Sequence, residues 1–136
     1  MNALTLRLIR AAFLCLALGI TLGASFAVDR ALGANLRLLH AELNLWGWVT
    51  LLIYGMGYHM LPRFAGQPLR SQQAAELQSW AAIGGVALAA VGWLASAWDV
   101  PGALALRGLA AALQLGAALG FAWLISGLLA PRRAER

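Results

Sequence analysis

Four stretches of this chain are each long and apolar enough to cross a lipid bilayer as a helix. They are residues 6–28, 36–61, 74–97 and 102–129. A helix needs about 20 predominantly apolar residues to cross the bilayer core. The segment must be helical because every backbone polar group has to find its partner within the segment. Only 11% of the 136 residues are charged and 62% are hydrophobic, which excludes an ordinary soluble domain. The sequence predicts an all-α integral membrane protein, a single four-helix bundle over residues 1–136.

Three short polar segments separate the apolar stretches, at residues 29–35, 63–71 and 98–102. We expect Pro62 to end the second helix, because proline lacks the N–H that a helix interior needs. Ser71 is expected to cap the start of the third helix. These short connections predict that neighbouring helices are antiparallel.

The arginines predict an orientation. The net charge is +5, and all of the basic residues are arginines because the chain contains no lysine. Seven of the arginines belong to the N-terminus, the second connection and the C-terminal tail: Arg7, Arg10, Arg63, Arg70, Arg132, Arg133 and Arg136. The opposite side holds Arg30, Arg37 and Arg107. The positive-inside rule therefore places both termini in the cytoplasm, and we expect the bacterial inner membrane. Arginines at helix ends indicate topology and not a nucleic-acid surface.

The second apolar stretch carries both histidines, His40 and His59, together with the acid Glu42. Ionisable groups at membrane depth are costly and suggest a function. His59 follows His40 by 19 positions, which is about 28 Å along a helix, so the two histidines cannot share one metal ion. Each histidine needs its own partner.

His40 is the first candidate ligand. One helical face is expected to carry, after His40, the residues Asn44, Gly47, Leu51, Tyr54 and Tyr58, and Arg37 lies one turn earlier. A neutral imidazole inside a bundle is a good axial ligand for haem iron. Gly47 would leave room for the macrocycle, and Arg37 would pair with a propionate. The alternative is a histidine hydrogen-bonded to a neighbouring helix, with Arg37 extending to the membrane surface.

Glu42 and His59 have open interpretations. Glu42 could be a proton carrier, a metal ligand, an acid neutralised by burial or a carboxyl that reaches the outer headgroup region. His59 lies at the inner boundary, where it is either an interfacial anchor or the ligand of a second haem or metal. The single cysteine, Cys15, is expected to be a small buried apolar residue.

Small residues recur at helix-packing spacing in two stretches. Gly19 and Gly23 form a Gly-x-x-x-Gly motif in the first, and Gly108, Ala112, Gly116 and Gly120 follow one face of the last. Such faces allow close approach of helices, either within one bundle or between the subunits of a homo-oligomer.

Two unusual strings occupy the second stretch: Arg37-x-x-His40-Ala41-x-Leu43-Asn44-Leu45-x-Gly47-Trp48-Val49 and Gly55-Met56-x-Tyr58-His59-Met60-Leu61-Pro62-Arg63. Together they resemble the second transmembrane helix of the haem-copper oxidase subunit I superfamily, nearest to its nitric oxide reductase and NnrS-like branches. The resemblance implies that His40 is an axial ligand of a low-spin haem b near the outer face. Many relatives have histidine at the position of Glu42, which weakens a metal role there.

The chain lacks the copper-ligating histidines and the second haem ligand of the catalytic subunit, so we do not expect it to reduce oxygen or nitric oxide by itself. We expect a small membrane cytochrome b for electron transfer or for gas or redox sensing, with a respiratory-chain redox partner. In a homo-oligomer, two copies of His40 would share one haem; one haem per chain is the other arrangement. The alternatives are a cofactor-free accessory or assembly subunit of a respiratory complex, and a metal-handling protein that uses Glu42 and the histidines.

Overall fold

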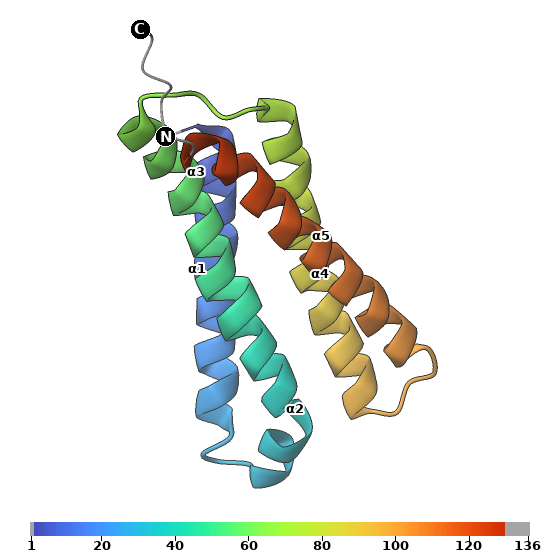
Figure 1. The fold of residues 1–136 in the computed structure, drawn as a ribbon. Helices are drawn as coiled ribbons and strands as arrows, with labels where there is room; N and C mark the ends of the chain where they lie inside the picture. The colour runs from blue at the N-terminus through green and yellow to red at the C-terminus, as the bar shows by residue number, and fades with distance from the viewer. Residues whose placement is uncertain (1, 130–136) are drawn as a thin grey trace, which may run out of the picture.

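The computed structural model describes residues 2–129, and all regular structure in this range is helical (Figure 1). The elements in chain order are α1 (Ala3–Ser25), α2 (Arg30–Glu42), η1 (Leu43–Thr50), α3 (Leu51–Ala65), α4 (Gln72–Ala97) and α5 (Ala103–Leu129). The predicted all-α class is therefore confirmed for this range. The tail arginines Arg132, Arg133 and Arg136 lie outside the described residues.

Three of the helices, α1, α4 and α5, are long and apolar enough to cross a membrane. Their outward side chains are apolar as well: Leu14 is 61% exposed and Leu119 is 62% exposed. Exposed apolar side chains of this kind suit a lipid environment, and together with the three long apolar helices they indicate a membrane protein. The second stretch is helical without interruption through α2, η1 and α3.

The helices form two antiparallel pairs, which are easily followed in Figure 1. One pair consists of α1 and the α2–η1–α3 rod, and the other consists of α4 and α5. The start of α1 and the end of α5 lie at the same end of the molecule, beside the α3–α4 connection. The core between the pairs includes Leu8, Leu51 and Leu124, each at most 1% exposed.

Two helix ends differ from the prediction. The helix of Pro62 continues to Ala65, where Gly66 adopts a left-handed φ of 61° and ends it. Pro62 lies in the last turn of the helix, which ends at Gly66. The helix therefore loses only the one hydrogen bond that the N–H missing from Pro62 would donate. The expected turn at residues 29–35 is also wrong, since α2 begins at Arg30.

Local capping explains where α2 and α4 begin. The Asp29 carboxylate accepts hydrogen bonds from the backbone N–H of Ala31 at 2.9 Å and of Leu32 at 3.0 Å. Ser71 Oγ accepts one from the Ala74 N–H at 3.1 Å, which confirms the predicted cap of the third apolar helix. In both cases the side chain satisfies N–H groups that have no partner inside the helix.

The rod that carries the histidines contains a π-helical segment, η1. At its end, Thr50 Oγ donates to the carbonyl of Leu45, five residues earlier, at 2.8 Å. A π-helix fits more residues into each turn, so it rotates the following residues relative to those before it. His40 therefore faces α1, whereas Tyr54 and Tyr58 contact Phe121 on α5. The single face expected from simple helical spacing is divided between two neighbours.

Candidate functional site

The His40 imidazole lies in a cradle formed by the two glycines of α1. Its Nδ1 is 2.9 Å from the carbonyl oxygen of Gly19. A Cβ at Gly23 would approach the imidazole Cε1 to 2.7 Å, so only glycine fits there. The ring of Phe26 packs edge-on against the imidazole, with centroids 5.6 Å apart. The Gly-x-x-x-Gly motif of α1 thus packs against the His40 side chain of the same molecule.

This contact determines the tautomer of the neutral His40 ring. A carbonyl oxygen only accepts hydrogen bonds, so Nδ1 must carry the proton. The Asn44 amide, 3.3 Å from Nδ1, has a better acceptor in the His40 carbonyl at 2.8 Å. Nε2 of the neutral ring is then the unprotonated nitrogen, the form that binds a metal. Histidine ligands are commonly oriented by such an Nδ1–H bond to a backbone carbonyl.

Asn44 and Gly47 pack against α1, whereas the haem interpretation of the sequence expected open space for a macrocycle beside Gly47. A Cβ on Gly19 would lie 2.6 Å from the Asn44 amide nitrogen, so this side chain is packed directly on α1. A Cβ on Gly47 would lie 2.6 Å from the Cβ of Cys15. These contacts fill the space that a macrocycle would need between the rod and α1. The His40 imidazole fits the role of axial ligand, but the Asn44–Gly47 face does not offer room for a haem.

Arg37 is exposed and, among residues 2–129, has no hydrogen-bond or ion-pair partner. It lies one turn before His40 in α2. A guanidinium at this position remains available to an external carboxylate.

Glu42 faces away from His40, toward the α4–α5 pair. Its carboxylate accepts a hydrogen bond from the Gln114 amide on α5, and Trp93 on α4 lines a cavity together with it. Sequence reasoning missed both neighbours, because nothing local connects positions 42, 93 and 114. The only available signal was that Gln114 is an isolated amide in an otherwise apolar stretch.

His59 has no link to these groups. Its ring lies against the guanidinium of Arg63, one turn later, with Nη1 3.0 Å from Nδ1. Because arginine is only a donor, this contact engages the lone pair that a metal would require. Within residues 2–129, no three His, Cys, Asp or Glu side chains lie close enough together to hold a metal ion.

A second polar link crosses the bundle beyond Glu42. The Tyr58 hydroxyl donates to the Gln78 side-chain oxygen at 2.9 Å, and the Gln78 amide donates to the Ala117 carbonyl at 3.0 Å. Gln78 is only 5% exposed, so these bonds satisfy a buried amide in an apolar interior. The network ties α3, α4 and α5 together at one level, a structural role.

The two predicted small-residue faces have different surroundings. Gly19 and Gly23 contact the rod, as described above, so this face is used within the bundle. On α5, Gly108 and Gly116 are exposed, and a Cβ at either position would meet nothing within 4 Å. A Cβ at Gly120 would lie 3.4 Å from Gln78 Cγ on α4, so the predicted α5 face is packed at Gly120 and open at Gly108 and Gly116.

No family model, curated protein or solved structure matches this chain.

Proposed function

We propose that the protein binds haem b and that His40 supplies an axial ligand through Nε2. The observation that supports this most directly is the His40 cradle, in which the Gly19 carbonyl holds Nδ1–H at 2.9 Å and leaves Nε2 unprotonated. The resemblance of residues 37–63 to the second helix of haem-copper oxidase subunit I points to the same histidine. Haem, when bound, supplies one-electron redox chemistry or a gas-binding iron.

The residues of the chain would have distinct tasks in this proposal. Gly19 and Gly23 orient the imidazole, and α1 excludes water from one side of it. Arg37, exposed and unpaired among the described residues, is available for a propionate. Since α1 fills the space beside Asn44 and Gly47, the cofactor would lie outside the α1–rod interface. This favours a site completed by a second copy of the chain or by a redox partner.

The proposal includes a fourth membrane crossing by the α2–η1–α3 rod, with both termini in the cytoplasm of a bacterium. An even number of crossings agrees with the position of the start of α1 and the end of α5 at one end of the molecule (Figure 1). Homo-oligomer contacts would use the open α5 face, since the α1 glycines are already occupied.

The test is a visible absorption spectrum of the detergent-purified protein, oxidised and dithionite-reduced. We expect a Soret band and sharp reduced α and β bands in the wild type and in His59→Ala, which is the matched control. His40→Ala should lose these bands while keeping its helical circular dichroism. Absence of a Soret band in wild type after haem supplementation would refute the proposal, as would full haem binding by His40→Ala.

A second candidate is a cofactor-free accessory subunit of a respiratory complex. The observation that favours it is the open α5 face around Gly108 and Gly116, whose packing needs no cofactor. Colourless protein that co-purifies with an oxidase or reductase, and loses that association in Gly116→Leu, would support it. The geometry offers no comparable argument for metal handling, because Glu42 and the histidines do not converge.

A further inference from the structure

One cavity of the bundle contains two opposite charges that do not pair. Glu42 and Arg107 both line a cavity of about 310 Å³ between the rod and the α4–α5 pair. Among residues 2–129 the single ion pair joins Arg7 and Glu76, so neither Glu42 nor Arg107 forms an ion pair. Ionisable groups at membrane depth are normally paired or functional.

Arg107 is held in place but keeps unused donors. Its guanidinium stacks on the Trp93 ring at 3.8 Å, and Nη1 donates to Ser96 Oγ at 3.3 Å. A Cβ at Gly92 would come within 2.8 Å of Arg107 Cγ, so this glycine admits the side chain. Its Nε is buried and has no hydrogen-bond partner. An unsatisfied buried N–H is destabilising, and a bound acceptor would remove that cost.

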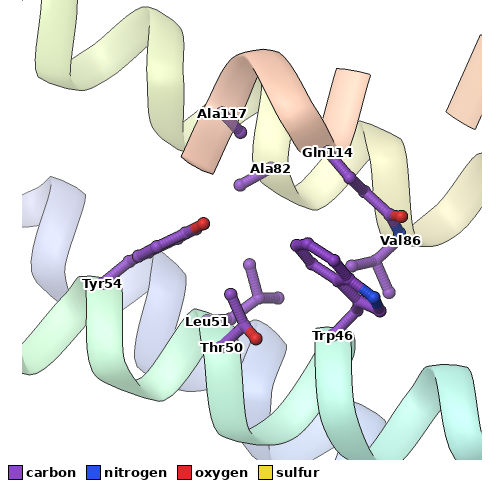
Figure 2. Close-up of a pocket in the computed structure, with 8 residues that line it drawn as sticks. All are labelled: Trp46, Thr50, Leu51, Tyr54, Ala82, Val86, Gln114 and Ala117. Atoms are coloured by element: carbon purple, nitrogen blue, oxygen red, sulfur yellow. The ribbon is translucent and has the colours of Figure 1, made fainter. Parts of the chain in front are cut away.

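Glu42 closes the inner end of the same cavity. Gln114 lines this cavity and also the gap shown in Figure 2, where it lies with Trp46, Tyr54 and Val86. That gap has no room for a water molecule. The cavity therefore ends on its inner side at the Glu42–Gln114 hydrogen bond, whereas the exposed residues Leu104, Gly108 and Ala111 of α5 form its outer rim.

The other end opens at the α4–α5 connection. A second cavity of about 440 Å³, lined by Asp99 and Gly102 of that connection, shares Leu104 and Arg107 with the first. A solute entering from this end meets Arg107 before Glu42. On α5, Arg107 precedes Gln114 by seven residues, about 10 Å along the helix axis.

We propose that this cavity binds a small amphoteric solute, with its anionic oxyacid group on Arg107 and its protonated amine on Glu42. The proposal rests on charge pairing: a ligand with one cationic and one anionic group pairs with both protein charges, whereas a simple anion or a simple cation leaves one of them unpaired. The site shares no residue with the His40 cradle, so it stands independently of haem binding.

The order of the two charges favours a soluble ligand over a lipid. The amine must reach the deeper position at Glu42, and the oxyanion stays nearer the mouth at Arg107. A phospholipid headgroup has its phosphate joined to the buried glycerol, so its amine is directed outward. Phosphoethanolamine has the required pair of groups, both as a free solute and as a lipid headgroup, and serves as the probe for both sources.

Binding is measured by isothermal titration calorimetry on the full-length protein in detergent. We expect phosphoethanolamine to bind, and ethanolamine and inorganic phosphate each to bind at least tenfold more weakly. Glu42→Gln keeps an acceptor for Gln114 but loses the charge, and should weaken phosphoethanolamine binding about tenfold or more. Arg107→Gln should do the same, with Arg107→Lys intermediate. Arg30→Gln, an exposed arginine at the same end, is the control and should bind as wild type does.

A second measurement compares the binding of phosphoethanolamine to the protein in nanodiscs that contain phosphatidylethanolamine and in nanodiscs that contain phosphatidylcholine. If phosphatidylethanolamine competes with phosphoethanolamine and phosphatidylcholine does not, the site binds the same amphoteric group as part of a lipid. If phosphoethanolamine binds equally well in both nanodiscs, the ligand is a soluble solute. Absence of phosphoethanolamine binding to the folded wild type would overturn the proposal. It would also be overturned if ethanolamine bound equally well, or if Glu42→Gln, with unchanged circular dichroism, bound normally.

Discussion

The His40 cradle makes a quantitative prediction about Gly23. In Gly23→Ala the new methyl carbon would lie 2.7 Å from His40 Cε1 and 3.1 Å from Nδ1. Carbon atoms in favourable contact are about 3.5–4.0 Å apart, so either the imidazole or α1 must move. Movement of the imidazole breaks its bond to the Gly19 carbonyl, whereas movement of α1 opens the packing along Asn44 and Cys15.

The expected size follows from two opposing effects. Adding a methyl group to a tightly packed site typically costs about 1–3 kcal/mol. Replacing a helical glycine with alanine returns up to about 1 kcal/mol of helix propensity. Gly116→Ala on α5 meets nothing within 4 Å, so it has the propensity gain without the clash. We therefore expect Gly23→Ala to be less stable than Gly116→Ala by about 2 kcal/mol.

The assay is reversible unfolding in mixed micelles by increasing the fraction of sodium dodecyl sulfate, followed by far-ultraviolet circular dichroism. Both variants change one glycine to alanine in an apolar helix, so their denatured states are closely matched. In haem-loaded protein, Gly23→Ala should also weaken the reduced α band. Equal stability of the two variants would refute the packing of His40 against Gly23.

Three further predictions concern other contacts and use the same unfolding assay. Gln78→Leu removes both bonds of the buried amide and leaves the Tyr58 hydroxyl unpaired, so we expect a loss of about 1–2 kcal/mol. Gly66→Ala places a side chain at a φ of 61° and should cost about 1 kcal/mol. Gly47→Ala should destabilise by about 2 kcal/mol through contact with Cys15, and adding Cys15→Gly should recover part of this loss.

Each of these predictions has a control and a contrary result. Gln73→Leu changes an exposed glutamine and should leave stability nearly unchanged; an equal loss from it would point to a general effect of glutamine removal. Gly66→Asn should be milder than Gly66→Ala, because asparagine tolerates the left-handed region, and the reverse order would contradict the capping argument. Purely additive effects at positions 47 and 15 would mean that these residues do not touch.

Much of the fold could be predicted from local patterns. Apolar stretches of about 20 residues must form helices in a bilayer, since backbone groups find no other partners there. The predicted α1, α4 and α5 therefore agree with the structure to within three residues at each end. The Ser71 cap was equally local, because a serine hydroxyl satisfies an N–H three residues later. The Asp29 cap used the same chemistry and was overlooked as part of a polar turn.

The candidate site was only partly predictable. His40 could be selected as a candidate because it is a histidine in an apolar helix, and the Gly19 and Gly23 motif indicated a close helix contact. The connection between them was not predictable, because helix rotation depends on packing along the whole length of the rod. The π-helical η1 alters that rotation within a single segment, and no local residue pattern predicted it.

The opposite charges of the α4–α5 cavity illustrate what tertiary structure alone decided. Helix positions, chain polarity and the glycine motif follow from apolarity and spacing along the chain. The meeting of Glu42 with Gln114, 72 residues later, and with the cavity of Arg107 depends on how two helix pairs rotate and pack. Apolar faces constrain that rotation only weakly in a membrane, because lipid solvates leucine as well as a neighbouring helix does. The few polar contacts and close glycine approaches decide it, and they exist only once the bundle has formed.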